Sequence, residues 1–514
     1  MTGGIIQLVA YGVQDIFLTK DPQITYFKIV YRRHTNFSIE TIPQKFKTDP
    51  NFGSKVSVIL PKSGDLIRKI YVVAELPNIS SFVEDDIISK KLKIAWVKNL
   101  GFALIKSVEI EIGGQSIDKH YGEWLYIWHE LVGPKDKGFD IMIGNIPTAT
   151  DFTNGKDPLR VYIPLQFWFC RKAGLALPII SLQYNEIKIN LELNDAKKCY
   201  INAPKNHIHI YDDIVQYKPF EYIEQNIDGI ISTGRFIYFD EVTKTLYYNR
   251  ISTTNFRSLI SSTELTLTEA KVEIRKPIYN KYSIIGITSQ FKSMPKINSS
   301  EKINSFPKLL NFNLKKCYLL VEYIFLDMDE RLKFSQAKHE YLIEQVQFSG
   351  NRLIDSTNMR ITTGFSHPCK EIIWACQLNY LTETRNNDFF NFTSDYKYIN
   401  GKHIGKNIIN NETIVFNGHE RVSMRSSDYF DTVQPYQHHS FSPSEGINMY
   451  SFCLFPEQYQ PSGPANLSKI DNMDLQFSTI NSFDIINNTK LKIYGVVYNV
   501  LRISNGLSGL VFFD

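Results

Sequence analysis

Apolar and polar residues alternate with a period of two in many short stretches of the chain. In residues 107–112, Val and Ile side chains would lie on one face of a strand and Glu side chains on the other. The two residues that follow are both glycine, which is typical of a two-residue hairpin turn. The same alternation recurs at 187–193, 264–275 and 490–503. These patterns predict an all-β chain built from β-sandwiches.

Helical periodicity is confined to two stretches. Between residues 118 and 131, large apolar residues recur at i, i+3, i+4 and i+7, which predicts an amphipathic helix with Asp118 as its N-cap. An apolar stripe of this kind is more typical of core packing than of a cofactor site. A second, short helix is expected at 329–334, between two strand-like runs.

A faint internal repeat divides the chain. Residues 160–193 and 448–478 share the order of a strand, a proline-containing connection, a short helical turn and an alternating strand. The chain has 514 residues, more than the roughly 250–300 at which single hydrophobic cores stop growing. We therefore predict an N-terminal arm at 1–23, a first sandwich at 24–215 and a second sandwich at 216–514.

Two long segments of the predicted second domain interrupt its strand pattern. Residues 230–307 mix short strand-like runs with Asn, Ser and Lys, and residues 386–446 are rich in Asn, Ser, Tyr and His. Long irregular segments are usually exposed and often functional. We interpret both as loop insertions that project from the surface.

The first 23 residues are predicted to form an arm that binds a partner. Asp15, Lys20 and Asp21 interrupt its apolar residues, so it fits neither a signal peptide nor a membrane span, which needs about 18 apolar residues. The run at 24–31 is expected to be the first strand of the first sandwich. The alternative is that the arm packs on its own first domain. The residues expected to contact a partner are Ile5, Ile6, Leu8, Tyr11, Phe17 and Leu18.

Charge and cysteine usage narrow the classes of partner. The net charge is +4 and the basic residues are scattered, so direct binding of nucleic acid is not expected. The six cysteines form no CxxC pair and several lie in apolar strand-like runs, which indicates buried thiols. Most Asn-X-Ser/Thr sequences are interpreted as chance matches. The candidate glycosylation sites are Asn298, Asn391 and Asn411.

One pair of residues is a candidate metal site. His207 and His209, at i and i+2 on one strand, would point the same way, as in metal-binding cupin barrels. The glycine expected upstream is absent, and Asp213 stands near where a glutamate ligand is needed. We favour two histidines on the polar face of a strand that closes the first sandwich, and interpret His438 and His439 as loop contacts. No catalytic residue, cofactor or metal is predicted, and the chain is not expected to be an enzyme.

Several stretches, in order along the chain, resemble the double jelly-roll major capsid proteins of nucleocytoplasmic large DNA viruses. The resemblance extends from Gly3 to Phe512. It departs from the family at 171–174, where the sequence is Arg-Lys-Ala-Gly and Lys-Ala replaces an Asn-Pro turn. It implies an all-β fold of two consecutive eight-stranded jelly rolls, with short helices and long loop insertions in the second domain. The stretches are the opening segment, IGGQSIDKHYGEWLYIWHEL, IPLQFWFCRKAGLALPIISLQYNE, DERLKFSQAKHEYLIEQVQF, TVQPYQHHS, YSFCLFPEQYQPSG and YNVLRISNGLSGLVF.

The resemblance also implies a function and partners. It implies a structural protein of the virion capsid that forms homotrimeric, pseudo-hexagonal capsomers tiling an icosahedral shell, made and assembled in the host cytoplasm. The expected partners are neighbouring capsomers, minor capsid and penton proteins and, through the N-terminal base, the inner viral membrane. Two alternatives stay open at this point: a metal-dependent, bicupin-like enzyme that uses His207 and His209, and a glycan-binding jelly-roll module.

Overall fold

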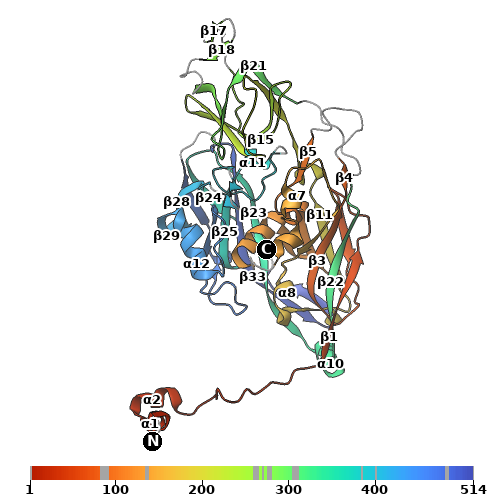
Figure 1. Ribbon diagram of the computed structural model, residues 1–514. Helices are drawn as coiled ribbons and strands as arrows, with labels where there is room; N and C mark the ends of the chain where they lie inside the picture. The colour runs from red at the N-terminus through yellow and green to blue at the C-terminus, as the bar shows by residue number, and fades with distance from the viewer. Residues whose placement is uncertain are drawn as a thin grey trace.

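The computed structural model of the protein shows two β-sandwiches side by side, a smaller β module above them and an extended arm below (Figure 1). The described residues are 3–80, 92–133, 138–258, 265–268, 271–274, 281–303, 312–383, 386–396, 398–399, 402–403, 405–480 and 485–512.

The first sandwich consists of two antiparallel sheets. One has the order β1 (Phe37–Lys45), β22 (Lys316–Leu326) and β3 (Leu66–Leu76), and β3 also pairs with β9 (Leu159–Pro164) and the short β10 (Leu177–Pro178). The other has the order β2 (Lys55–Ile59), β11 (Ile187–Leu193), β6 (Ile105–Ile112) and β7 (Gln115–Tyr121). The predicted hairpin is confirmed: Gly113 and Gly114 join β6 to β7 with φ values of 59° and 83°, which favour glycine.

The second sandwich repeats this strand order. One sheet has the order β23 (His339–Leu353), β33 (Thr489–Ser504) and β25 (Pro368–Leu378), and β25 also pairs with β30 (Ile447–Ser451) and the short β31 (Ala465–Asn466). The other has the order β24 (Asn358–Thr363), β32 (Met473–Thr479), β28 (Ile409–Phe416) and β29 (His419–Ser426). Each of these strands has a counterpart at the same place in the first sandwich, and the short β34 (Leu507–Leu510), which pairs with β33, has none among the described residues. Within the described residues, the chain therefore forms two consecutive eight-stranded jelly rolls, and the internal repeat is real.

The boundary predicted at residue 215 is wrong. β22, at 316–326, pairs with the whole length of β1 and also with β3, so it completes the first jelly roll. Between β11 and β22 the chain forms a separate module at 206–303, here called the head module. Its sheet has the order β20 (Lys292–Ser293), β19 (Ile284–Gly286), β14 (Tyr222–Ile227), β15 (Ile230–Asp240), β16 (Thr245–Arg250), β13 (Asn206–Ile210) and β21 (Pro295–Lys302).

Neither predicted loop insertion lies where the sequence placed it. The described residues of 230–303 belong to the head module, which interrupts the first jelly roll and not the second. Within 386–446, strands β28 and β29 are part of the second jelly roll, and α12 (Gln434–His438) packs beside β30. Alternation shows which face of a strand is apolar but does not show which strand it pairs with. A polar strand whose partners are far away in the sequence therefore resembles a loop. The first of the two segments, 230–303, also contains a hairpin of β17 (Leu265–Thr268) and β18 (Lys271–Ile274).

One apolar cluster spans both jelly rolls, and the second jelly roll also has a core of its own. Helix α5 (Gly122–Val132), the predicted amphipathic helix, contributes Trp124, Leu125, Ile127 and Leu131 to a cluster that extends into β23, β25 and β33. The helix begins four residues later than Asp118, which lies in β7 instead of capping α5. The second predicted helix is confirmed as α10 (Met328–Gln336). All six cysteines are buried and unpaired, as predicted.

The arm is longer than predicted. No strand forms at 24–31 in the structure, and the first strand starts at Phe37. The arm consists of α1 (Gly3–Val9), α2 (Val13–Thr19) and an extended linker at 20–36 that leaves the base of the first jelly roll (Figure 1). A strand-like sequence needs a neighbouring strand, and the linker has none within the part of the chain that the structure describes. Among the described residues, no helix is long and apolar enough to span a membrane.

Candidate assembly site

The contact between the jelly rolls is built on helix α5 of the first one. Apolar rings cross the boundary: Trp124 packs against Tyr494 of β33 with ring centroids 5.3 Å apart. Polar contacts reinforce it at the other side of the helix, where the backbone N–H and hydroxyl of Ser444 donate to Glu130 at 3.1 and 2.9 Å. The two jelly rolls are therefore joined by a packed interface.

Ion pairs lie at the centre of this interface. Glu344 of β23 accepts hydrogen bonds from Arg171, at the end of α8 (Trp168–Arg171) in the first jelly roll, and from Lys370 of β25 at 2.7 Å. Trp128 of α5 contacts both cations: the guanidinium of Arg171 lies 4.2 Å from its ring centroid and the ammonium of Lys370 lies 5.7 Å from it. The Lys370 ammonium also donates to the carbonyl oxygen of Pro456 at 2.6 Å. Two domains are thus bridged by paired charges that water barely reaches.

A buried histidine continues the cluster. Nε2 of His439 lies 2.8 Å from Glu371, and Nδ1 lies 3.2 Å from Glu457. Burial opposes the charged imidazolium, but the two carboxylates outweigh burial and raise the pKa of His439 to about 9. The protonated ring can donate from both nitrogens at neutral pH. His439 is therefore a structural cation, more than the loop contact expected from the sequence.

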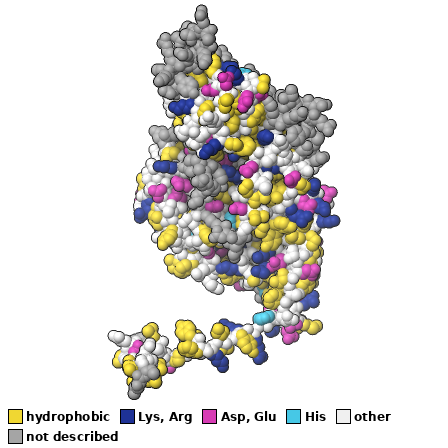
Figure 2. Space-filling model, viewed as in Figure 1, with side chains coloured by type: hydrophobic (Ala, Val, Ile, Leu, Met, Phe, Trp, Pro, Cys, Tyr) yellow, Lys and Arg dark blue, Asp and Glu magenta, His cyan; other side chains and the backbone are white. Residues whose placement is uncertain are grey.

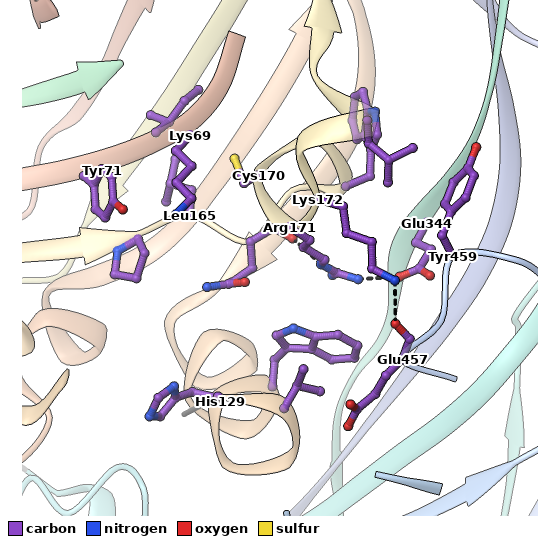
Figure 3. Close-up of a pocket in the computed structure, with 18 of the residues that line it drawn as sticks. Lys69, Tyr71, His129, Leu165, Cys170, Arg171, Lys172, Glu344, Glu457 and Tyr459 are labelled. Atoms are coloured by element: carbon purple, nitrogen blue, oxygen red, sulfur yellow. Dashed lines mark hydrogen bonds and ion pairs between the residues drawn. The ribbon is translucent and has the colours of Figure 1, made fainter. Parts of the chain in front are cut away.

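A cleft opens beside this cluster, between the two jelly rolls (Figure 3). Its volume is about 410 Å³. In Figure 3, the Arg171 guanidinium points to Glu344 and the Lys172 ammonium to Glu457, and the other side chains line an open space next to them. Lys69 and Lys172 lie at its rim. The main apolar lining residues are Val132, Phe139, Met142, Leu165, Leu175 and Leu342.

The arm exposes the apolar residues that the sequence singled out. Figure 2 shows apolar side chains on the arm helices and basic side chains along the linker. Leu8 and Leu18 are 81% and 87% exposed, and Ile5, Ile6 and Tyr11 are also exposed; the side chain of Phe17 lies outside the described residues. The linker exposes aromatic residues too, with Phe27 97% exposed. Such a density of exposed apolar side chains is typical of a surface that binds a partner.

The histidine pair lies in the head module, not in a strand that closes the first jelly roll. His207 and His209 are on β13, which pairs with β16 and β21, and His209 Nδ1 lies 2.8 Å from the hydroxyl of Thr245. The rings do point to the same side of the strand, with centroids 5.7 Å apart. No group of three or more His, Cys, Asp or Glu side chains in the described part of the chain could hold a metal ion.

The candidate glycosylation sites differ in exposure. Asn391 is fully buried, and its amide donates to the Asp395 carbonyl oxygen at 2.8 Å, so a glycan cannot be attached to it in the folded protein. This prediction is wrong because exposure cannot be read from an Asn-X-Thr sequence. Asn411, on β28, is partly exposed. The side chain of Asn298, on β21, lies outside the described residues.

Sequence reasoning missed the charged cluster between the domains. Lys370 and Glu371 are adjacent charges inside an otherwise apolar strand, PCKEIIWACQL, and both are fully buried. Charged residues are almost never fully buried unless they are paired, so this local pattern is the signal that predicts a buried ion pair. Their partners, such as Arg171, are too distant in sequence to be identified from it.

Two family models match most of the chain. One, described as the N-terminus of a major capsid protein, matches residues 25–234, and the other, described as a large eukaryotic DNA virus major capsid protein, matches residues 330–509. Among curated relatives, probable capsid protein 4 of Acanthamoeba polyphaga mimivirus is 43% identical over 519 residues, covering 100% of this chain and 99% of the relative. The major capsid protein of Pyramimonas orientalis virus is 35% identical over 540 residues, covering all of both chains.

Solved structures agree with these matches. A capsid protein in a quasi-atomic structure of the PBCV-1 virus capsid is 26% identical, with a TM-score of 0.58, and the match covers 95% of this chain and 100% of that one. The Faustovirus major capsid protein matches with a TM-score of 0.65 over 96% of this chain and 94% of that one. At 14% identity, the second likeness supports the fold alone.

Proposed function

The chain belongs to the major capsid proteins of large eukaryotic DNA viruses, and we propose that three copies of it form one pseudo-hexagonal capsomer. It is a structural protein of the virion capsid. The observation that carries the proposal is the pair of equivalent jelly rolls joined side by side through an apolar cluster that spans both. Three such chains around a threefold axis present six similar units, which gives a nearly hexagonal outline.

The two ends of the chain have different roles in the proposed capsomer. The head module and the arm project from opposite ends of the paired jelly rolls (Figure 1), so one faces outward when the other faces the particle interior. We assign the outward side to the head module. The base, with the basic and aromatic linker at 20–36, would then meet minor capsid and penton proteins and the inner viral membrane. Trimers would assemble into shells in the host cytoplasm.

Measurement of the molar mass in solution tests the trimer. Three chains of 59.5 kDa have a mass of about 180 kDa, and light scattering at micromolar concentration should report it. A stable monomer of 59.5 kDa in physiological buffer would contradict the proposed capsomer.

Truncation of the arm tests its role in assembly. Removing residues 1–23 should leave trimers that fold and sediment normally, because the first strand begins only at Phe37. In infected cells, we expect such trimers to fail to complete closed shells, which electron microscopy of thin sections would show. Misfolding of the truncated chain would place the arm in the core, and normal shells would remove its assembly role.

A further inference from the structure

Two apolar surfaces are left uncovered by the described residues: the helical tip of the arm, at residues 3–19, and the cleft between the jelly rolls. We propose that the arm tip of one copy docks in the cleft of a neighbouring copy. This inference rests on the proposed trimer and names the surface that the arm tip binds. Four properties of the tip and the cleft support it: helix length, position, charge and reach.

The arm tip has the form of a segment that binds a groove. α1 and α2 have seven residues each, and isolated helices shorter than about 12–15 residues are marginal in water. Apolar residues recur at i, i+3 and i+4 in both, as in helices that lay one face into an apolar groove. A partner surface would therefore both cover these side chains and stabilise the two helices. The repeating residues are Ile5, Leu8 and Val9 in α1 and Val13, Ile16 and Phe17 in α2.

The cleft lies near the end of the molecule from which the arm leaves. At the base, Phe37 of β1 is opposite Leu326 of β22, and Lys69 at the cleft rim is opposite Glu322 of the same strand. Four residues of a strand correspond to about 13 Å. The cleft rim and the root of the arm are therefore at neighbouring levels along the sheet, so an arm that runs along the base of a capsomer passes close to the clefts of its neighbours.

The charges of the two surfaces are complementary. Within residues 3–19, Asp15 is the only charged residue. In the cleft, the carboxylates of Glu344 and Glu457 are already paired with cations of the interdomain cluster. Lys172 donates to a neutral carbonyl oxygen at 3.0 Å, so its positive charge is not compensated by that contact. A nearly uncharged segment with one carboxylate suits an apolar cleft with a basic rim.

The linker places the tip within reach of another copy. In the structure the tip lies away from the body of its own chain, below the jelly rolls (Figure 1). The 17 residues at 20–36 can span roughly 55 Å when extended. Around a threefold axis, a tip-to-cleft contact from each copy to the next is a head-to-tail contact that closes after three copies. Every tip and every cleft of the trimer is then occupied.

Site-specific photo-crosslinking in the full-length chain tests the proposal. A photoreactive phenylalanine analogue replaces Ile16 in one tagged chain, which is co-expressed with a second chain carrying a different tag. We expect mass spectrometry to find crosslinks from position 16 to peptides that contain Phe139–Met142 or Leu342 of the other chain. The same analogue at Tyr26, in the exposed linker, is the matched control and should not label these peptides. Crosslinks confined to the same chain would overturn docking between copies.

Two pairs of variants connect the crosslink to the cleft. Leu342→Glu and Met142→Glu place a carboxylate at partly exposed lining positions, so the fold tolerates them. Each should lower the yield of the interchain crosslink about tenfold or more, because a charge buried against apolar side chains is costly. Leu332→Glu and Met328→Glu make the same changes at exposed positions of α10, outside the cleft, and should leave the yield unchanged.

The outcomes separate this inference from the proposed capsomer. A 180 kDa particle without interchain crosslinks from position 16 would overturn the docking and leave the trimer intact. An anionic amphiphile is the alternative occupant of an apolar cleft with a basic rim. Native mass spectrometry of the same sample would detect such a molecule, and its presence in the cleft would also overturn the docking of the arm tip. Crosslinks that persist in Leu342→Glu and Met142→Glu would show that the tip binds elsewhere.

Discussion

The two jelly rolls have the same strand order but differ in whether the charged residues of their strands are exposed to water. In the first, the cross-strand pair between Lys188 of β11 and Glu111 of β6 is partly exposed, with the two side chains 36% and 21% accessible. In the second, Lys370 and Glu371 of β25 lie inside the strand with no access to water. Strand order therefore does not depend on where charges lie, because it is set by the alternation of apolar residues.

The buried charges mark the surface on which the two jelly rolls meet. Lys370 shares Glu344 with Arg171 of the first jelly roll. The first jelly roll contributes a buried charge in return: Asp118 of β7 lies 2.9 Å from His120 and accepts a hydrogen bond from the backbone N–H of Val346 at 3.0 Å. An apolar interface would hold two sandwiches together in many orientations. Paired charges with fixed partners favour one orientation, which a regular capsomer needs.

Removing the buried cation that the second jelly roll contributes to the interface should have the largest effect. Lys370→Met leaves Glu344 with one cationic partner in a buried site and the Pro456 carbonyl without its donor. Breaking a buried pair in this way costs roughly 3–5 kcal/mol. Chemical denaturation at fixed protein concentration measures the loss.

Lys188→Met in the first jelly roll is the matched control. Its pair with Glu111 is partly exposed, and pairs of this kind contribute about 0–1 kcal/mol. Equal losses of free energy of unfolding in the two variants would contradict the distinction between the jelly rolls.

Alkaline pH should weaken the side of the interface that the second jelly roll contributes, because His439 loses its charge. Its folded-state pKa of about 9 is above the usual value, so the stabilisation is complete below about pH 6.5 and is lost as pH rises through 9. Between pH 7 and pH 10 the loss should be roughly 2–3 kcal/mol, because the ring no longer pairs with Glu371 and Glu457 as a cation. Thermal unfolding at a series of pH values measures it.

Neighbouring histidines provide the comparison for this titration. His439→Gln should flatten the alkaline loss, and His438→Gln, whose ring is partly exposed, should keep it. The partly buried Lys98 also titrates in this range. Desolvation lowers its pKa to about 8, so its contribution to stability rises with pH, and this contribution is common to both variants. Identical pH profiles of the two variants would show that His439 does not cause the loss of stability at alkaline pH.

Local patterns in the sequence predicted local structure well. The Gly113-Gly114 hairpin and the alternating strand β11 follow from spacing that involves few residues. Partners distant in sequence did not follow, because alternation assigns a face to a strand but carries no information on its neighbours. β22 therefore completes the first jelly roll unexpectedly.

The arm and the assembly site show the same limit. Residues 24–31 have a strand pattern without an edge to pair with, so the propensity is present and the strand is not. The apolar residues of the arm were predicted to contact a partner because polar residues interrupt them too often for a buried strand or a membrane span, and those whose side chains are described are exposed. The interdomain cluster needs Arg171 and Lys370 to meet in space, which no local pattern encodes.

Excision of the head module should have the smallest effect on the jelly rolls. The module enters and leaves at one point, since the backbone N–H of Ile303 donates to the Lys205 carbonyl oxygen at 2.9 Å. It also has its own apolar core. Replacing residues 206–302 by a two-residue link should therefore preserve the pairing of β22 with β1. Exposure of Phe152, which packs in a cluster with Ile237 of the module, should cost about 1–2 kcal/mol.

The measured quantities are the molar mass and the thermal unfolding curve of the shortened chain. A single unfolding transition and a trimeric mass would show that the first jelly roll, like the second, is complete without the chain between its last two strands. The second jelly roll already joins β32 to β33 through residues 480–488 alone, which makes it the natural standard for the excised first one. Loss of cooperative unfolding would mean that the head module holds β22 in place, and the two jelly rolls would then be equivalent in strand order but not in the way they are stabilised.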